Sequence, residues 1–305
     1  MSTKLYDVAI LTESRYESPT DQSEYVQNIL TEDGLVKAAL EKHGLRVIRL
    51  DWARPDFDWS TVRVALFRTV WDYFHRFDTF QKWLKRVVQH TQLINPPELI
   101  YWNMDKHYLG DLMQRGVHCT PTIFIPIGST EGLASLHQKH NLKETVLKPA
   151  VSGAARHTYR LNPNNYAQHE TLFQELIANE AMLLQPFQYN VLTEGEITLI
   201  LIDGKYTHAI KKTAKAGDFR VQDDFGGTVR PYTPTKEEID FAEHALAQCS
   251  PLPIYARVDI IRDNADQLAV SELEMIEPEL WFRYCPEAAQ ALADGIAKKY
   301  FGEKG

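Results

Sequence analysis

Acidic side chains recur at alternate positions in the segment Ile254–Pro278, where their spacing could support metal-ion chemistry. Two apolar runs flank the polar stretch Asp263–Asp266, a pattern typical of an antiparallel hairpin. A turn at that stretch places Arg257 opposite Glu272. Because side chains alternate between the two faces of a strand, a shift of register by two residues keeps each residue on its face.

In the same register Asp259 faces Val270. The charged residues predicted to share one face are Arg257, Asp259, Glu272 and Glu274. The apolar residues predicted to share the opposite, core face are Ile254, Ala256, Val258, Ile260, Leu273 and Met275. The hairpin therefore presents one charged face and one apolar face.

A sheet face that gathers three carboxylates needs positive charge, because the carboxylates repel one another. A hard divalent cation with oxygen ligands would supply that charge, and Mg²⁺ commonly shares such a site with phosphate. We therefore interpret Asp259, Glu272 and Glu274 as candidate metal ligands. The alternative, from these residues alone, is a solvated sheet face with an arginine–glutamate pair across the strands.

Basic residues could hold the phosphates that accompany such a cation. Lys148 ends an apolar strand and precedes the small-residue loop Ser152–Ala155, whose backbone N–H groups could cradle phosphate. Further basic candidates are Lys106, Lys211, Lys212, Lys215 and Arg220. The sequence contains neither GxxxxGKS/T nor GxGxxG, so we do not expect a P-loop or Rossmann nucleotide site.

The first hundred residues alternate strand and helix patterns and predict a largely parallel α/β layer. Strands are expected at Tyr6–Leu11, Leu45–Leu50 and Thr61–Phe67. Helical apolar spacing covers residues 25–40, with an interruption at Gly34 and an end at Gly44. A second helix follows, with Asp78 as its N-cap. An Asn-Pro-Pro run at 95–97 breaks this order, and we place a domain boundary there.

The rest of the chain predicts antiparallel hairpins mixed with helices. Asp203-Gly204 joins the strands 196–202 and 205–211 in a two-residue turn. Thr235 and Glu238 form a capping box that opens an amphipathic helix. Other helices are expected near 105–115, 167–178 and 286–300, and other strands near 122–127 and 145–148. The predicted fold class is α/β followed by α+β.

The segment RTVWDY at 68–73 follows an apolar strand, and strand ends in α/β sheets often meet ligands. We expect Arg68 to bind a substrate carboxylate and Asp72 to bind a substrate amine. In the alternative interpretation, Trp71 and Tyr73 pack a domain interface and Asp72 caps a turn.

Together these motifs resemble the ATP-grasp superfamily, on the branch of bacterial glutathione synthetases and ribosomal-protein glutamate ligases. The stretch Glu196–Gly204, the run KAGDFR at 215–220 and the pair Gly226-Gly227 are similar to the glutamate ligases. The segment ARVD at 256–259 is similar to a strand of D-alanine–D-alanine ligases.

A smaller group within the superfamily, which contains an O-ureidoserine cyclo-ligase, resembles the chain more widely. The similar segments are RTVWDY at 68–73 and NPPELIYWNMDKHYL at 95–109. The resemblance covers residues 95–282 well and is weaker over 1–94. It implies an ATP-grasp fold behind an N-terminal parallel α/β domain. The implied parts are a substrate-side domain at 1–97, a central subdomain with the phosphate loop at 98–184, and a C-terminal subdomain with the metal site at 185–305.

The resemblance also implies roles for individual residues. The implied ATP-binding residues are Lys106, Lys148, Ser152, Gly153, Gln185, Pro186, Phe187, Glu196 and Lys212. The hinge Gln185–Phe187 would read adenine through its backbone, and Glu196 would take the ribose hydroxyls. Arg220 and Arg257 would be catalytic, near the acyl group and the transferred phosphoryl group.

The implied metal ligands are Asp259, Glu272 and Glu274, with Mg²⁺ as the ion and Mn²⁺ as an alternative. The chain departs from the family pattern at two places. Glu274 stands where this branch usually has Asn, and the loop after Lys148 is poorer in glycine than usual.

The activity implied by the resemblance is an ADP-forming ligase that joins a carboxylate to an amine through an acyl phosphate. Its substrates would be small amino-acid-like or peptide-like molecules, with ATP and Mg²⁺. A small-molecule kinase and a non-catalytic nucleotide-binding regulator are the alternatives. The residues do not reveal the substrate, and they do not separate intermolecular ligation from cyclisation.

The composition limits the classes of partner that we expect the chain to bind. The chain has 305 residues and a net charge of −8, so a broad basic surface for nucleic acid is not expected. Its three cysteines, Cys119, Cys249 and Cys285, form no CxxC pair, which is typical of a reducing compartment. No apolar run approaches the length of a membrane span. We expect a cytoplasmic protein without nucleic-acid or membrane partners, and a homo-oligomer stays open.

Overall fold

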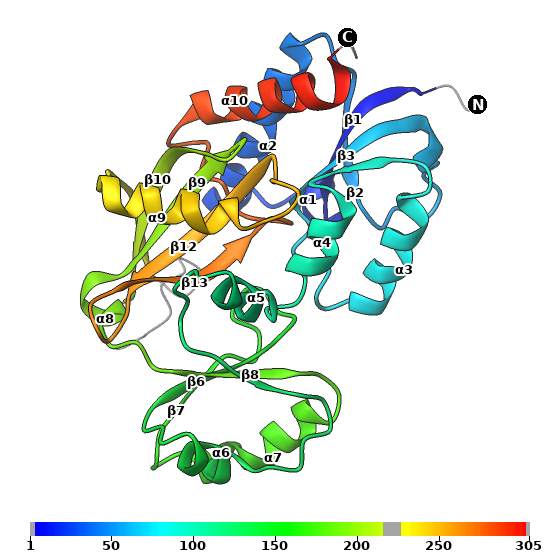
Figure 1. The fold of residues 1–305 in the computed structure, drawn as a ribbon. Helices are drawn as coiled ribbons and strands as arrows, with labels where there is room; N and C mark the ends of the chain where they lie inside the picture. The colour runs from blue at the N-terminus through cyan, green and yellow to red at the C-terminus, as the bar shows by residue number, and fades with distance from the viewer. Residues whose placement is uncertain (1–3, 216–226, 303–305) are drawn as a thin grey trace.

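The computed structural model describes residues 4–215 and 227–302. Its strands form three β-sheets, each with helices packed against it. In Figure 1 the N-terminal sheet lies at the upper right, the C-terminal sheet at the left and the central sheet at the bottom. Among the described residues, no helix is both long and apolar enough to cross a membrane.

The N-terminal sheet has the strand order β2-β1-β3-β4, and all of its pairs are parallel. Its strands are β1 (Tyr6–Thr12), β2 (Val47–Asp51), β3 (Val62–Thr69) and β4 (Gln92–Ile94). Nearly all of β1 is buried, because α2 (Glu24–Lys42) covers one face of the sheet and α3 (Phe77–Val87) covers the other. The predicted parallel α/β layer is confirmed.

Two details of the predicted helices are wrong. α2 runs unbroken through Gly34, because the burial of its apolar face outweighs the roughly 1 kcal/mol helix propensity cost of one glycine. Gly44 does follow the helix, with a φ of +74°. α3 begins at Phe77 with Arg76 in the N-cap position, so Asp78 lies in the first turn instead. An acidic residue is favourable there because it faces the positive end of the helix dipole.

The central sheet has the order β5-β8-β6-β7, with antiparallel pairs. Its strands are β5 (Ile123–Ile125), β6 (Thr145–Pro149), β7 (Tyr159–Leu161) and β8 (Met182–Pro186). Helices α6 (Leu133–Lys139) and α7 (Tyr166–Ile177) pack on it. Strand β8 was not predicted because it is a short apolar run without the alternation that marks a half-exposed strand.

The C-terminal sheet has the antiparallel order β11-β10-β9-β12-β13. Its strands are β9 (Glu196–Ile202), β10 (Lys205–Thr213), β11 (Thr228–Tyr232), β12 (Tyr255–Arg262) and β13 (Leu268–Glu274). The Asp203-Gly204 turn has positive φ at both residues, as a type I′ hairpin requires. The predicted capping box of Thr235 and Glu238 opens α9 (Lys236–Ala247).

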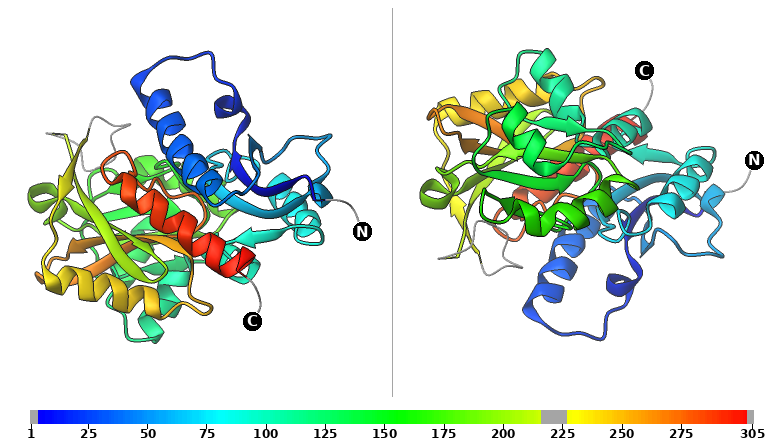
Figure 2. Two further views of the ribbon diagram at one scale, coloured as in Figure 1. Left: turned by 90° about the horizontal axis from the view of Figure 1, so that it is seen from above. Right: turned by 90° about the horizontal axis from the view of Figure 1, so that it is seen from below.

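The packing places some segments differently from the predicted parts. Helices α4 (Pro97–Asn103) and α5 (Tyr108–Gln114) share a core with α9 and the C-terminal sheet, and Phe124 of β5 packs against the same core. Strand β8 runs across the predicted boundary at 184/185. Helix α10 (Pro286–Ile296) returns to the N-terminal domain and lies beside α2 (Figure 2). Helix α10 therefore packs between the N-terminal domain and the C-terminal sheet.

Short elements complete the chain. They are α1 (Ser14–Glu17), α8 (Val191–Glu194), a 3-10 turn at Trp59–Thr61 and a π-helical turn at Ala297–Phe301. Helix α1 follows β1 at the carboxyl edge of the parallel sheet, where ligands of α/β proteins commonly bind.

Candidate active site

The charged hairpin has the predicted faces in a different register. Arg257 lies opposite Glu274, and Asp259 lies opposite Glu272. The predicted pairs of Arg257 with Glu272 and of Asp259 with Val270 are therefore wrong by two residues. Ile260 pairs with Val270, so Ser271 is the extra residue of a β-bulge. The sequence pattern predicted the shared face, whereas the register depends on a turn at 263–267, one residue longer than predicted, and on the bulge, which shifts the pairing by one more residue.

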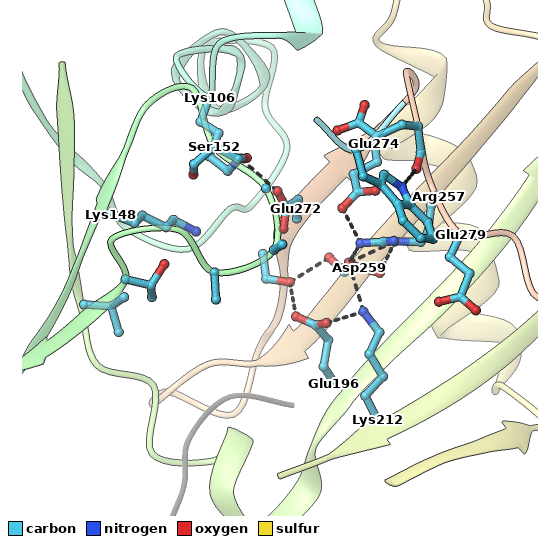
Figure 3. A pocket seen from close by; sticks show the side chains of 18 of the residues that line it. Lys106, Lys148, Ser152, Glu196, Lys212, Arg257, Asp259, Glu272, Glu274 and Glu279 are labelled. Carbon is cyan, nitrogen blue, oxygen red and sulfur yellow. Dashed lines mark hydrogen bonds and ion pairs between the residues drawn. The ribbon is translucent and has the colours of Figure 1, made fainter. Parts of the chain in front are cut away.

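Three carboxylates converge on this face. One oxygen from each of Asp259, Glu272 and Glu274 lies within 4.8 Å of the other two. Hard oxygen donors at this spacing fit a divalent cation. Each carboxylate also has a cationic partner in the structure (Figure 3). Each still offers more lone pairs than that partner uses, so a cation can share the site.

The partners of these carboxylates set their charge. Burial would raise the pKa of Glu272, but Lys106, Lys148 and Arg257 lower it to about 2. The Nζ atom of Lys106 lies 3.0 Å from Glu272 Oε1. Burial also opposes ionisation of Asp259, yet Arg257 and Lys212 hold its pKa below the usual value. Both carboxylates are therefore charged at neutral pH.

Glu274 behaves differently. Burial raises its pKa to about 8, and repulsion from Glu272 and Asp259 adds to that rise. The attraction of Arg257, with which Glu274 pairs, does not offset these effects. This is the electrostatic frustration expected where acidic side chains surround a position for a cation.

The three carboxylates line a cavity of about 650 Å³. Residues from the N-terminal domain, the central sheet and the C-terminal sheet also line it. Figure 3 shows Lys148 and Lys106 on one side of the carboxylates and Glu196 with Lys212 on another. Every predicted ATP-binding and metal-binding side chain lines this cavity, as does Arg257. Arg220 lies outside the described residues.

The phosphate-loop candidates follow β6. Lys148 projects from that strand into the cavity, and burial lowers its pKa. Lys106 Nζ donates to Ser152 O at 2.6 Å and so joins the loop to Glu272. Gly153 packs closely on Phe74: a Cβ there would lie 2.6 Å from the ring atom Cε1. The loop is thus held against the N-terminal domain.

Glu196 and Lys212 face each other across β9 and β10. Lys212 Nζ lies 2.8 Å from Glu196 Oε1 and 3.3 Å from Asp259 Oδ2. The bulged Ser271 donates to Glu196 Oε2 at 2.9 Å. Each carboxylate oxygen has a second lone pair, so Glu196 can still accept a hydroxyl from a ligand.

The hinge residues Gln185–Phe187 also line the cavity. Gln185 Nε2 donates to Thr122 Oγ1 at 2.8 Å. The Phe187 N–H donates to Glu144 O, and its carbonyl accepts from Asn264 Nδ2. Both main-chain groups of Phe187 are thus engaged within the chain, and the predicted reading of adenine by this backbone depends on the second lone pair of the Phe187 carbonyl oxygen.

The substrate-binding prediction for Arg68 needs correction. Arg68 is 2% exposed, does not line the cavity, and pairs with Glu32 and Asp33 at 3.4 Å. Asp72 accepts from Trp52 Nε1 at 2.7 Å and from Arg76 at 2.9 Å, and it also lies outside the lining. The alternative interpretation fits better, because Trp71 and Tyr73 pack between the domains.

Other residues line the substrate-side wall in place of Arg68 and Asp72. From the N-terminal domain these are Arg15, Tyr16, Tyr25, Trp71, Phe74 and His75. From the segment after β13 these are Glu277, Glu279 and Trp281. Apart from Trp71 in RTVWDY, none of them stands in a motif, so sequence reasoning had no signal for them. Trp281 lies beneath both Lys212 and Arg257, each 5.5 Å from a ring centroid.

Two family models match successive stretches of the chain. A model for the N-terminal domain of D-cycloserine synthetase DcsG matches residues 8–95. A model for the RimK-like ATP-grasp domain matches residues 130–277. The second match contains all three carboxylates of the hairpin and the loop after Lys148.

Individual relatives agree with these models. The cycloserine biosynthesis protein DcsG of Streptomyces lavendulae is 29% identical over 265 residues, which cover 82% of this chain and 87% of that protein. A crystal structure of D-cycloserine synthetase DcsG matches with a TM-score of 0.84 at 27% identity, covering 96% of this chain and 99% of that chain. A D-alanine–D-alanine ligase from Bacillus anthracis shares the fold, with a TM-score of 0.64, 16% identity and 97% coverage of both chains.

Residues 130–277 form a RimK-like ATP-grasp domain, and the homologues of the chain are ATP-grasp ligases that join a carboxylate to an amine. Ligases of this superfamily use ATP and divalent metal ions. The predicted fold, superfamily and ligase class are therefore confirmed.

Proposed function

We propose that the chain is a Mg²⁺-dependent ligase that activates the carboxylate of a small amino-acid-like molecule as an acyl phosphate. One observation carries the proposal: Asp259, Glu272 and Glu274 converge within 4.8 Å in a cavity that also holds Lys106, Lys148, Lys212 and Arg257. A carboxylate and a triphosphate repel each other, and such a set of charges offsets that repulsion.

Different residues along the cavity bind different parts of ATP and its metal ion. Lys148 and the loop at Ser152 and Gly153 bind the phosphates, and the hinge Gln185–Phe187 holds the base. Glu196 accepts from the ribose. Asp259, Glu272 and Glu274 would hold Mg²⁺, which neutralises phosphate charge during transfer.

The substrate carboxylate attacks the γ-phosphorus of ATP, the bond to the β-γ bridging oxygen breaks, and ADP leaves. A nitrogen nucleophile then attacks the acyl carbon of the acyl phosphate and loses its proton, and inorganic phosphate leaves. Arg257 faces the reacting groups and stabilises the negative oxygen of the tetrahedral intermediate. We assign the same task to Arg220 on the strength of its sequence motif alone.

The substrate-side wall supports a small substrate. The match over residues 8–95 is to the N-terminal domain of a D-cycloserine synthetase, and this stretch contributes the wall residues Arg15, Tyr16, Tyr25 and Trp71. We therefore take both enantiomers of O-ureidoserine as the first candidate substrates. Their carboxylate and nitrogen nucleophile belong to one molecule, so ligation would close a ring.

ADP release with mass analysis of the products tests the proposal. The purified chain with ATP, Mg²⁺ and either enantiomer of O-ureidoserine should release ADP in step with a cyclised product. Serine and D-alanine, each with and without added hydroxylamine, form the comparison set, because hydroxylamine traps acyl phosphates as hydroxamates. A stable phosphorylated hydroxyl product would indicate a kinase, and the absence of ATP turnover with every substrate would contradict the proposal.

A further inference from the structure

Six charged side chains form a chain of ion pairs behind the substrate-side wall. The network consists of Arg49, Arg68 and Arg283 with Glu32, Asp33 and Glu279. Three guanidinium groups meet three carboxylates, so the network is balanced in charge. Its centre is buried: Arg68 is 2% exposed, Glu32 3% and Asp33 1%.

The first end of the network holds helix α1. Arg49 Nε lies 2.7 Å from Asp33 Oδ2. Its Nη1 donates to the main-chain oxygen of Tyr16 at 2.5 Å. Because Tyr16 lines the cavity, Arg49 connects a buried carboxylate of α2 to the wall itself.

The centre of the network joins the two domains. Arg68 lies 3.4 Å from both Asp33 Oδ1 and Glu32 Oε2. Its Nη1 donates to Pro278 O at 3.2 Å, in the segment that follows the metal-site strand β13. A nearby bond runs in parallel, since Trp71 Nε1 donates to Glu277 O at 2.9 Å.

The second end of the network holds Glu279. Arg283 Nη1 lies 2.5 Å from Glu32 Oε1 and 2.6 Å from Glu279 Oε1. Glu279, in the segment after β13, also lines the cavity and is labelled in Figure 3. The two lining residues are therefore joined through five charged side chains.

The burial of these charges has an electrostatic cost. Burial raises the pKa of Glu32 even though Arg68 and Arg283 oppose the rise. Buried ion pairs often contribute no more stability than apolar side chains of similar size, because desolvation offsets their attraction. Ion pairs do fix geometry, since each guanidinium bonds in defined directions.

We propose that Arg49, Arg68 and Arg283 are positioning residues, which fix Tyr16 and Glu279 as a single rigid wall for the organic substrate. This inference rests on the proposed function for the identity of the substrate, but its geometric content does not. It predicts that a change at one end of the network alters the other end. It also predicts that the nucleotide half of the cavity is insensitive to the network.

The test uses Arg283→Met and Arg283→Lys at one end and Arg49→Gln at the other. Arg46→Met is the matched control, because Arg46 pairs with Asp7 at the surface and its side chain is 55% exposed. Hydrogen exchange monitored by mass spectrometry reports on residues 14–17 and 277–283. Steady-state ADP release reports KM for ATP and for O-ureidoserine separately.

Arg283→Met should raise the exchange rates of both segments at least fivefold, and Arg49→Gln should do the same. KM for O-ureidoserine should rise at least tenfold while KM for ATP stays within twofold. Arg283→Lys should raise KM for O-ureidoserine less than Arg283→Met does, because lysine keeps the positive charge. Arg46→Met should change none of these values.

Exchange that rises only next to the substituted residue would overturn the proposal, as would equal increases in both KM values. If Arg283→Met does not fold, Arg49→Gln decides the question through exchange at 277–283. If the unmodified protein does not turn over O-ureidoserine, the proposed substrate is wrong. The exchange measurements still decide whether the network couples the two ends.

Discussion

Asp259 on β12 lies directly opposite Glu272 on β13, and Glu272 is the neighbour of the bulged residue Ser271. The bulge turns the Ser271 hydroxyl toward the site, where it donates to Glu196 Oε2 at 2.9 Å and to Asp259 O at 3.1 Å. The two facing carboxylates and the ribose-side candidate Glu196 are thus joined through one irregular residue. A regular hairpin would not make this connection.

Lys148→Ala should weaken the binding of ATP with Mg²⁺ about tenfold to a hundredfold. A hydrogen bond to a charged group contributes roughly 1.5–3 kcal/mol, and Lys148 lines the cavity beside the loop that we propose binds phosphate. Titration calorimetry gives the dissociation constant. Lys205→Ala is the control, because that side chain is 78% exposed. Unchanged affinity in Lys148→Ala would remove the lysine from the nucleotide site.

Gly153→Ala should impair the use of ATP, whereas Gly34→Ala should stabilise the fold. A Cβ on Gly153 would meet the Phe74 ring at 2.6 Å, so either the ring or the loop must shift, and we expect KM for ATP to rise severalfold. A Cβ on Gly34 has no atom within 4 Å, and alanine at this exposed position of α2 should stabilise the protein by about 0.5–1 kcal/mol. Thermal unfolding and ADP-release kinetics measure the pair. A lower melting temperature for Gly34→Ala would contradict the unbroken helix.

Asn264→Ala should loosen the hinge next to the base. Asn264 Nδ2 donates to Phe187 O at 2.8 Å, and Tyr189 N donates to Asn264 Oδ1 at 2.8 Å. The loss of two such bonds at about 1 kcal/mol each predicts a KM for ATP roughly tenfold higher or more, with kcat largely kept. Asn264→Asp keeps the acceptor for the Tyr189 N–H, so its KM for ATP should lie between the values of the unmodified protein and of Asn264→Ala. A fall in kcat at constant KM would place the effect elsewhere.

Glu274→Asn should be milder than changes at the other two carboxylates. An amide oxygen can still ligate a cation, and the resemblance to this branch of the superfamily favours Asn at the position. The variant should need severalfold more Mg²⁺ for half-maximal ADP release and should keep most of its kcat at saturating Mg²⁺. Complete inactivity at saturating Mg²⁺ would give Glu274 a role beyond holding the ion.

The predictable parts of the fold depended on local patterns. Apolar alternation identified the charged and core faces of the β12–β13 hairpin. Asp203-Gly204 marked the turn between β9 and β10, and Thr235 marked the start of α9. The register was wrong by two residues, because the turn is one residue longer than predicted and because the bulge at Ser271 follows from packing across strands and not from the pattern of one strand. Helix α2 passes Gly34 for a similar reason, since burial against the sheet outweighs local propensity.

The candidate site divides in the same way. Residues in motifs, such as Lys148 and Glu272, reached the cavity as expected. Arg68 also stands in a motif, but a strand end alone cannot tell a ligand contact from a buried ion pair. Tyr16 and Glu279 were not predicted because only the folded chain brings α1 beside the segment after β13.

The central claim is that Asp259 and Glu272 hold the catalytic cation. The most direct measurement is the rate of ADP release by Asp259→Asn and Glu272→Gln as a function of Mg²⁺ concentration. Each change removes a charge and nearly keeps the shape. We predict that kcat falls at least a hundredfold in each variant, about 2.7 kcal/mol of transition-state stabilisation. Turnover near that of the unmodified protein at limiting Mg²⁺ would contradict the claim and leave the hairpin as a charged sheet face without a metal ion.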